Sequence, residues 1–266
     1  MSFSAIRHLP VGGKRLDRSA KPTPRQLAAE KIFGIRFVEF RRLAAGNTAK
    51  NYKAVAEDGK AYFVKSASAA GVDSLIRLYA SLCSPLVPKV EFGGKTGDFD
   101  GERMFAMDWV DGGVSVDPEN LNQEQMDSLL LSYDELSLAM GEGMIHGDIH
   151  YNNILFKGNR VVSFLDFEMM RRGEPTDDLL RVFIHALERT RFWRVRRISK
   201  IESNFRTLVG RSKYSKEMWL GSIDNYERRK NARRKKKSRF GWAKAIECKL
   251  RSPLYVKMRS LVSEAK

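Results

Sequence analysis

Residues 145–155 read IHGDIHYNNIL, and residues 164–168 read FLDFE. Between them lies the segment KGNR, residues 157–160, with a short apolar run on each side. A Gly-Asn pair between β-rich runs is a hairpin signal, so we predict two short strands joined at this turn. Such a hairpin brings Asn153, at the start of the first strand, next to Asp166, at the end of the second.

Asp148, Asn153 and Asp166 are the kinds of side chain that phosphoryl transfer requires. The reaction needs one carboxylate near the acceptor hydroxyl, and hard oxygen ligands that hold Mg²⁺ against the nucleotide phosphates. Asp148 opens a loop that leaves a predicted helix, and Asn153 follows it by five residues. The two segments therefore predict the catalytic and metal-binding half of a phosphotransferase site.

The motif His-Gly-Asp-x-x-x-x-Asn, followed by a hydrophobic residue and Asp-Phe-Glu, resembles the aminoglycoside phosphotransferase and choline kinase branch of the kinase-like fold. Ordinary protein kinases carry Arg at the position of Gly147 and Gly at the position of Glu168. Downstream, the segment GEPTDDLLR at residues 173–181 is similar to the family's Pro-x-x-Asp-Leu segment. Ordinary loop residues of an unrelated α/β protein, or an inactive member of the fold, are the alternative interpretations.

The resemblance implies a role for each of five side chains. Asp148 would be the catalytic base, and Asn153 and Asp166 would bind the metal. His146 would orient the loop without taking part in the chemistry, and Asp178 would brace the catalytic loop. The implied cofactors are ATP and Mg²⁺.

The implied fold class is α+β, a two-lobed protein-kinase-like fold with a small antiparallel-sheet N-lobe and a mainly helical C-lobe. Apolar periodicity and turn residues agree with it. They predict strands over residues 37–43, 52–56, 61–66, 87–92 and 103–109, and helices over residues 71–83, 122–140 and 177–188.

A chain of 266 residues with 42% hydrophobic content buries a sizeable core, and its length suits one two-lobed domain. We expect a flexible basic leader over residues 1–36 with one short helix over 24–33, an N-lobe over 37–110, a C-lobe with the catalytic loop over 111–227, and a basic tail with an amphipathic segment over 228–266.

The predicted nucleotide site draws on three parts of the N-lobe. Lys65 ends an apolar strand and matches the family's strand lysine, which contacts the α- and β-phosphates. The turn Gly46-Asn47-Thr48 looks like the short loop that closes over the phosphates. Met107 and Trp109 lie at the position of the hinge between the lobes, where backbone groups would meet adenine and apolar side chains would pack on it.

One feature departs from the family pattern. The predicted helix over residues 71–83 contains no Glu to pair with Lys65, and its only acidic residue is Asp73. Either Asp73 substitutes for the missing carboxylate, or the partner of Lys65 lies elsewhere, for example in the leader. The missing glutamate also favours a non-catalytic module that binds a polyanion without turning over ATP.

Positive charge is concentrated in the last part of the chain. Residues 1–190 hold 24 Lys and Arg against 26 Asp and Glu, whereas residues 191–266 hold 24 against 6. Within residues 228–239, nine of twelve residues are cations. This asymmetry indicates a polyanionic partner: nucleic acid, an anionic membrane surface, or a phosphorylated glycolipid.

The segment after this cluster has an amphipathic pattern. Trp242, Ile246 and Leu250 share one helical face, and apolar residues at 254, 258, 261 and 262 repeat the arrangement. A basic amphipathic segment suits the surface of an anionic membrane; a helix docked on the C-lobe is the equal alternative. No apolar run reaches the roughly 18 residues of a membrane span. We therefore expect a cytoplasmic protein, peripheral at the inner face of the membrane.

The basic C-terminal half favours an anionic acceptor, because cationic acceptors such as aminoglycosides and choline favour acidic walls. The chain is similar in general character to bacterial kinases that phosphorylate sugars of the lipopolysaccharide core. Our leading hypothesis is an ATP- and Mg²⁺-dependent kinase that phosphorylates a hydroxyl of such an anionic glycan or glycolipid. The alternatives are a soluble small-molecule kinase, an RNA-associated kinase or ATPase of the RIO type, and a non-catalytic polyanion-binding pseudokinase.

Overall fold

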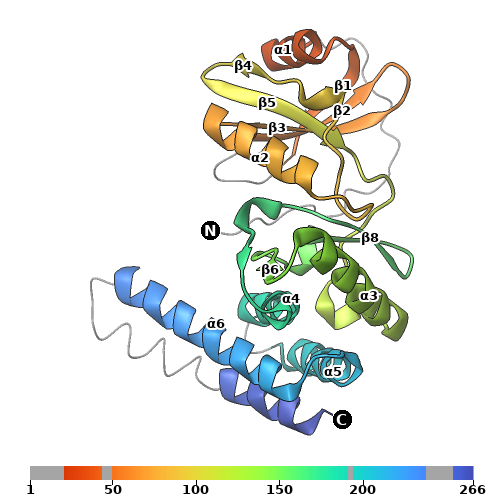
Figure 1. Ribbon diagram of the computed structural model, residues 1–266. Coiled ribbons are helices and arrows are strands. Elements are labelled where there is room, and N and C mark those ends of the chain that lie inside the picture. Colours follow the sequence, from red (N-terminus) through yellow and green to blue (C-terminus); the bar gives the residue numbers. More distant parts are fainter. Residues whose placement is uncertain (1–20, 44–49, 191–193, 238–253, 266) are drawn as a thin grey trace. The chain divides into compact units, whose positions relative to one another are not determined.

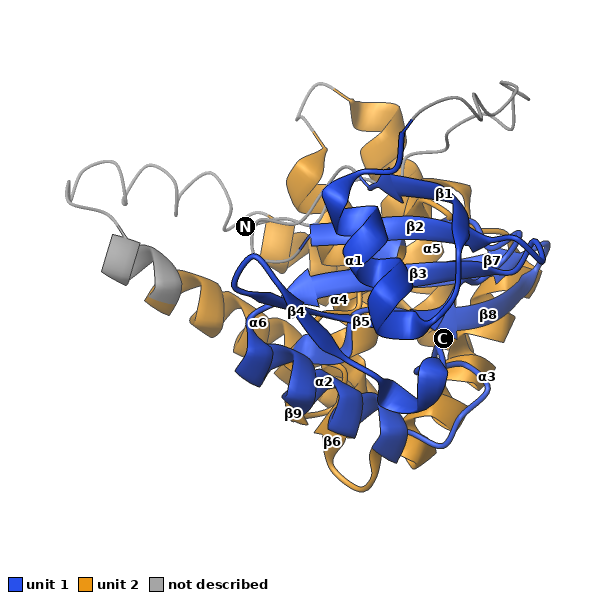
Figure 2. Ribbon diagram, turned by 90° about the horizontal axis from the view of Figure 1, so that it is seen from above, with its two compact units in different colours: residues 1–115, 152–168 blue, residues 116–151, 169–266 orange. Residues whose placement is uncertain are grey.

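The computed structural model describes residues 21–43, 50–190, 194–237 and 254–265 (Figure 1). The chain divides into two compact units, which Figure 2 shows in different colours. Unit 1 comprises residues 1–115 and 152–168, and unit 2 comprises residues 116–151 and 169–266.

The centre of unit 1 is a five-stranded antiparallel sheet in the order β1-β2-β3-β5-β4. Side chains along its strands alternate between the two faces, as expected for pleated strands. The turn between β2 and β3 contains Gly59 at φ 85°, a backbone conformation that glycine adopts without strain. The strands are β1 Phe37–Arg42, β2 Lys50–Ala56, β3 Ala61–Ala67, β4 Gly97–Phe99 and β5 Glu102–Asp108.

Helix α1, Pro24–Phe33, packs on one face of this sheet through Ala29 and Phe33. Thr23 caps its start by accepting a hydrogen bond from the Gln26 N–H at 3.2 Å, and Gly34 ends it in the left-handed conformation. The described part of the expected flexible leader is therefore a folded helix within unit 1. Residues 1–20 lie outside the described residues.

Helix α2, Ala69–Ser81, contacts β3 and β5. Tyr62 and Val64 of β3 belong to the core beneath α1, so the alternation of the strand sends Phe63 and Lys65 to the opposite face. Unit 1 also contains the hairpin of β7, Ile154–Lys157, and β8, Arg160–Phe164, as the Gly-Asn turn predicts.

The predicted strand over residues 87–92 does not form. Only Val90 makes an isolated bridge, to Met107 of β5. The edge position is taken instead by β4, a strand of three residues between glycine-containing turns, which is too short to leave a period-two pattern in the sequence. Short 3-10 helices lie at Phe92–Gly94 and Phe167–Met169, and a third spans Tyr151–Asn153.

Unit 2 is mainly helical. The predicted long helix forms as α3, Gln123–Met140, and Asn122 and Gln125 close its start with a reciprocal capping box. Its buried side chains follow the predicted spacing. The other elements are the 3-10 helix Pro118–Asn120, the two-stranded pair of β6 Met144–Ile145 and β9 Arg171–Arg172, and the helices α4 Pro175–Arg189, α5 Val195–Arg211 and α6 Lys216–Lys237.

Aromatic side chains join three of these helices. Phe183 of α4 lies 5.4 Å from Phe205 of α5, and Phe205 lies 5.6 Å from Trp219 of α6, measured between ring centroids. All three side chains are fully buried. They form the core that holds α4 in place, together with Asp177 and Asp178 in its first turn.

Residues 254–264 form a further helix, most of whose apolar side chains face inward. Tyr255, Met258 and Leu261 are buried, and Arg259 pairs with Asp224 and Glu227 of α6 at 2.7 and 2.6 Å. This part of the predicted interfacial segment is thus a helix docked within unit 2, because its apolar face is already covered. The part with Trp242, Ile246 and Leu250 lies outside the described residues.

Among the residues that the structure describes, no helix combines the length and the apolar character that a membrane span needs.

Candidate active site

Unit 1 contains a pocket of about 140 Å³ beside the β3–β5 face of the sheet. Its walls are largely apolar, and a few polar groups converge on it, which is typical of a ligand site. Five of the predicted site residues line it together: Lys65, Met107, Trp109, Asn153 and Asp166. The predicted loop residues Gly46, Asn47 and Thr48 lie outside the described residues.

Lys65 is almost fully buried at the end of β3 and faces two carboxylates. Its ammonium group pairs with Glu168 and lies 3.6 Å from Oδ1 of Asp166. Burial lowers the pKa of Lys65, and the charge of Asp166 opposes that shift. A buried ammonium is stable only with such partners, so the carboxylates keep Lys65 charged.

Among the described residues, the partners of Lys65 are therefore Glu168 and Asp166, and neither Asp73 nor the described part of the leader supplies one. Asp73 pairs with Arg103 instead, at 2.9 Å. The sequence contains a signal for Glu168, because it lies two residues after Asp166 in the segment FLDFE. In the sequence, this glutamate also distinguishes the chain from protein kinases.

Asn153 and Asp166 approach each other at the ends of the β7–β8 hairpin. The Leu165 N–H donates to the Asn153 carbonyl at 2.9 Å, which fixes the two ends. Asp166 has φ 70°, an uncommon conformation for a residue other than glycine, and such residues cluster at functional sites. An amide oxygen and a carboxylate lining one pocket are hard donors of the kind that Mg²⁺ accepts.

The catalytic loop lies in unit 2, directly after β6. Gly147 has φ 79°, and a Cβ atom there would lie 2.1 Å from the Met169 carbonyl oxygen and 3.3 Å from Cγ of Arg171. The backbone that follows β6 thus passes closely over the segment that leads into β9. Only glycine fits this approach.

Asp178 binds this loop from the first turn of α4. Its carboxylate accepts hydrogen bonds from the N–H groups of His146 and Gly147 at 2.7 and 2.9 Å, and from the Tyr133 hydroxyl at 2.9 Å. Burial raises the pKa of Asp178 to about 6, although these three donors favour its charged form. The predicted bracing residue therefore joins α3, α4 and the catalytic loop.

Asp148 is partly buried and forms an ion pair with Arg181 of α4. Its own N–H lies 3.3 Å from Nδ1 of His146, which places His146 beneath the loop. Sequence reasoning missed Arg181. Its position three residues after Asp178 puts both side chains on one face of a helix, and this spacing is the signal that would have found it.

Two further histidines lie next to Asp148 in unit 2. The rings of His150 and His185 stack at 4.5 Å between centroids, with 18° between their planes. Burial lowers the pKa of His150 to about 4 and that of His185 to about 3, and nearby arginines contribute in the same direction. Both rings are therefore neutral at pH 7.

Comparisons with known proteins agree with this geometry. Residues 115–201, which span Asp148, Asn153, Asp166 and Asp178, match the model of the phosphotransferase enzyme family, APH. No curated protein matches the chain.

Two solved structures are similar to the chain. One is the amicoumacin kinase hAmiN in complex with AMP-PNP, Ca²⁺ and Ami, at 12% identity and a TM-score of 0.55; the match covers 74% of this chain and 80% of that one. The other is a thermostable mutant of the aminoglycoside phosphotransferase APH(4)-Ia with ADP and hygromycin B, at 12% identity and a TM-score of 0.48; it covers 91% of this chain and 98% of that one.

The likeness to the amicoumacin kinase confirms the predicted fold class, an antiparallel-sheet part and a helical part of the kinase-like type. The family match confirms the predicted resemblance to the aminoglycoside phosphotransferase branch, and with it the prediction of a phosphotransferase.

Proposed function

We propose that this chain is an ATP- and Mg²⁺-dependent kinase that phosphorylates a hydroxyl group of an anionic glycan or glycolipid, with a lipopolysaccharide core sugar as the leading acceptor. The observation that carries the kinase assignment is the pocket of unit 1, where Lys65, Asn153 and Asp166 meet apolar walls. The amicoumacin kinase of similar fold was solved with an ATP analogue and a divalent cation, which supports the choice of cofactors.

In this proposal the residues of unit 1 hold the nucleotide. Met107 and Trp109 contact adenine, and Lys65 offsets the negative charge of the phosphates. Asn153 and Asp166 would hold Mg²⁺, which neutralises charge that develops on the transferred phosphoryl group.

Unit 2 supplies the group that acts on the acceptor. Asp148 accepts the proton of the attacking hydroxyl as the phosphoryl group moves in line. The backbone bonds to Asp178 fix the loop, and Arg181 orients the Asp148 carboxylate. Holding a base in place before the reaction lowers the cost of reaching the transition state.

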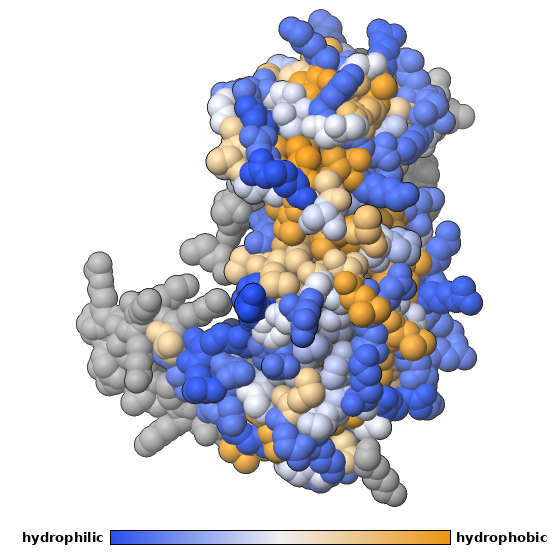
Figure 3. All heavy atoms as spheres, viewed as in Figure 1, coloured by the Kyte–Doolittle hydropathy of each residue, from blue (hydrophilic) through white to orange (hydrophobic). Residues whose placement is uncertain are grey.

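Charge supports an anionic acceptor. Residues 191–266 carry 24 cations against 6 acids, and Figure 3 shows hydrophilic residues gathered over the visible side of α6. The cytoplasmic location at the inner face of the membrane stays a prediction, and with it the membrane contact of residues 228–266. Nucleic acid, bound by the same cations, is the less favoured partner.

A soluble kinase for a small molecule is the second candidate. The family match supports it as well as it supports the first, since the match lies in the catalytic part of the chain and says nothing of the acceptor.

ATP turnover by the purified chain with Mg²⁺ tests the proposal, with three acceptors supplied in parallel: lipopolysaccharide with part or all of its core phosphates removed, total RNA, and a panel of small hydroxylated metabolites. We expect phosphate on the lipopolysaccharide. Asp148→Ala should abolish the transfer and keep nucleotide binding. Asp127→Asn, an exposed α3 aspartate paired with Arg211, is the matched control.

Transfer to a metabolite alone would select the second candidate. Loss of nucleotide binding in a folded Asp148→Ala variant would contradict the assignment of Asp148 as the base.

A further inference from the structure

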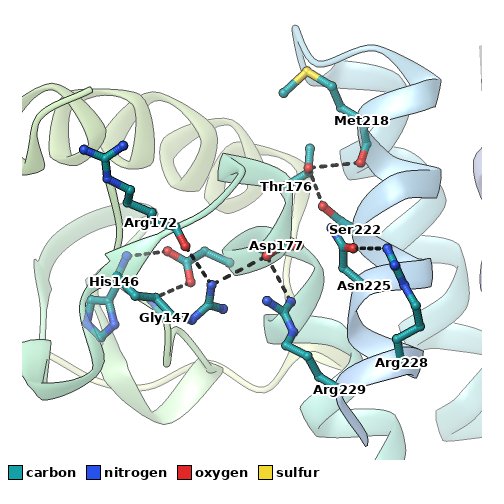
Figure 4. Close-up of polar contacts among 12 residues, drawn as sticks. His146, Gly147, Arg172, Thr176, Asp177, Met218, Ser222, Asn225, Arg228 and Arg229 are labelled. Carbon is teal, nitrogen blue, oxygen red and sulfur yellow. Dashed lines mark hydrogen bonds and ion pairs between the residues drawn. The ribbon is translucent and has the colours of Figure 1, made fainter. Parts of the chain in front are cut away.

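Unit 2 contains an open pocket of about 570 Å³ between β9 and the second half of α6. Four arginines line it: Arg171 and Arg172 from β9, and Arg228 and Arg229 from α6. We call it the arginine pocket; Figure 4 shows the side chains around it.

Positive charge in the arginine pocket exceeds negative charge. Its lining contains two carboxylates, Glu174 and Asp177, against the four guanidinium groups. Asp177 is almost fully buried; it pairs with Arg229 at 2.9 Å and lies 3.8 Å from Arg171. The other two cations contact no carboxylate lining the pocket: the Arg228 guanidinium donates to the Asn225 side chain at 2.5 Å, and Arg172 is exposed.

The guanidinium groups are crowded in this pocket. Burial lowers the pKa of Arg171, and the neighbouring charge of Arg229 lowers it further. Asp177 offsets part of this repulsion, since its carboxylate contacts both Arg171 and Arg229; an added anion would offset the remaining positive charge. The crowding therefore favours a bound anion.

The walls of the pocket are fixed. The Thr176 hydroxyl, at the start of α4, donates to the Met218 carbonyl at 3.2 Å and lies 2.7 Å from the Ser222 hydroxyl, so α4 and α6 are tied together (Figure 4). Thr176 and Ser222 are buried. A ligand thus meets a backbone frame that is already fixed, and Asp177 holds Arg229 and Arg171 within it, which lowers the entropy cost of binding.

The arginine pocket is connected to the catalytic loop within unit 2. β9 pairs with β6 in the register Met144↔Arg172 and Ile145↔Arg171, and the next residue after β6 is His146. Arg171 also lies against Gly147, where an added Cβ would be 3.3 Å from its Cγ. Asp177 and Asp178 are neighbours in α4: the first binds the arginines, and the second binds the loop that carries Asp148.

We propose that the arginine pocket binds a phosphate group that the acceptor already carries, so the enzyme acts on a sugar that is phosphorylated at another position. This inference rests on the proposed function and narrows its acceptor class. The planar guanidinium group donates in a fork that matches phosphate oxygens.

The composition of the pocket favours a sugar phosphate over RNA. Proteins that bind single-stranded nucleic acid stack bases on aromatic side chains. The described residues that line the pocket include none: besides the four arginines and two carboxylates they are Gly173, Asn225 and Ala232. Polar lining of this kind suits the hydroxyl groups of a sugar.

Calorimetric titration of the full chain, saturated with AMP-PNP and Mg²⁺ so that the nucleotide site is blocked, tests the pocket directly. The probes are inorganic phosphate and glucose 6-phosphate, with glucose as the control ligand. We expect both phosphates to bind and glucose not to bind. The double variant Arg172→Gln, Arg228→Gln should bind them at least tenfold more weakly.

Two single variants sharpen this test. Arg206→Gln removes an exposed arginine of α5 that pairs with Glu264, outside the pocket, and should leave phosphate binding unchanged. Glu174→Gln removes a carboxylate from the pocket wall and should tighten binding severalfold. Equal binding by the wild type and the double variant, or no binding by the wild type, would overturn the proposal.

A third arm distinguishes the source of the phosphate. Vesicles that contain phosphatidic acid present the same chemistry on a lipid. If the double variant lost affinity for these vesicles but kept its affinity for glucose 6-phosphate, the ligand would be a lipid headgroup and the proposal would be wrong.

Kinetics separate this inference from the proposed function. With an acceptor that keeps a phosphate at another position, the double variant should raise KM for the acceptor about tenfold and leave kcat and KM for ATP unchanged. With an acceptor that lacks phosphate, the two proteins should behave alike. Transfer with an unchanged KM would reject the pocket and keep the kinase; phosphate binding without any transfer would keep the pocket and reject the kinase.

Discussion

Gly147 lies where the predicted catalytic loop leaves no room for a Cβ atom. Gly147→Ala should destabilise the protein by about 2 kcal/mol or more, because it adds a clash with the Met169 carbonyl to an unfavourable φ. Gly158→Ala is the matched control, since its φ is also positive but nothing lies within 4 Å of the new Cβ. It should cost only about 1 kcal/mol. Denaturant unfolding measures both, and equal costs would contradict the packing described for the loop.

Glu168 is expected to matter for nucleotide use because it neutralises the buried Lys65. Glu168→Gln should lower kcat/KM for ATP about tenfold to a hundredfold, since a hydrogen bond to a charged group contributes about 1.5–3 kcal/mol. Asp73→Asn tests the alternative partner and should change kcat/KM for ATP no more than about twofold, as Asp73 pairs with Arg103. A larger loss in Asp73→Asn than in Glu168→Gln would reverse the assignment.

The pairing of residues shows what the sequence can and cannot predict at this scale. Asn153 and Asp166 could be placed together from a Gly-Asn turn, because the hairpin that joins them is local. Lys65 and Glu168 are separated by 103 residues, and no periodicity or turn connects them. Arg181 was missed for a related reason: its partner Asp148 lies 33 residues away in a loop, although its own helix was predicted.

At the scale of elements, the stacked histidines join the catalytic loop to α4 and make folding sensitive to acid. His150 and His185 have pKa values of about 4 and about 3 in the folded protein, below the ordinary value of 6.5. Between pH 6.5 and pH 4 the two histidines bind protons in the unfolded chain but not in the folded protein. The stability that depends on the two neutral rings is therefore complete above pH 6.5 and is lost as the pH falls toward 4. Asp178 opposes this loss, because its pKa is raised to about 6 and the cost of its charged form disappears at lower pH.

Denaturant unfolding at pH 7.5 and pH 5.0 measures this loss. We expect about 2 kcal/mol for each histidine, at about 1.4 kcal/mol per pH unit. His185→Phe keeps an aromatic ring in the stack and removes one titrating group, so the loss between the two pH values should be about 2 kcal/mol smaller than in the wild type, since Asp178 contributes equally in both proteins. An undiminished pH dependence in this variant would assign the effect to other groups.

The elements were predicted best where a whole helix or hairpin carries its own pattern. α3 has an apolar stripe and a capping box, and both are visible in the sequence. The helix of residues 254–264 has an equally clear stripe, yet the stripe alone does not tell a membrane surface from a neighbouring helix. In the structure this helix packs against α6, and Arg259 pairs with two carboxylates of α6.

At the scale of the whole molecule, the uneven distribution of charge predicts an electrostatic component in acceptor binding. Binding of the full chain to anionic vesicles or to an anionic glycolipid should weaken steeply with salt, because the Debye length falls from about 10 Å at 0.1 M to about 3 Å at 1 M. KM for ATP should change much less, as Lys65 is buried. Co-sedimentation over a salt series measures the first quantity, with zwitterionic vesicles as the control. Affinity that is insensitive to salt would argue for an apolar contact instead.

Removing the basic tail before Arg228 would be a poor test of its role. Such a truncation removes the second half of α6 and the helix of residues 254–264, whose Met258 and Leu261 are buried. Deleting buried side chains of this size costs about 2–5 kcal/mol each. Substitution of single exposed arginines separates charge from folding.

The ion pairs of Lys65 bear on how such an enzyme is regulated. Protein kinases hold the equivalent lysine with a glutamate from a helix that moves, and that movement switches them on and off. Here the carboxylates that pair with Lys65 are Asp166 and Glu168, two residues apart on one short segment of unit 1. The helix α2, whose Asp73 is tied to Arg103, supplies neither of them. Under the proposed function, the charge partners of Lys65 therefore do not depend on where α2 lies.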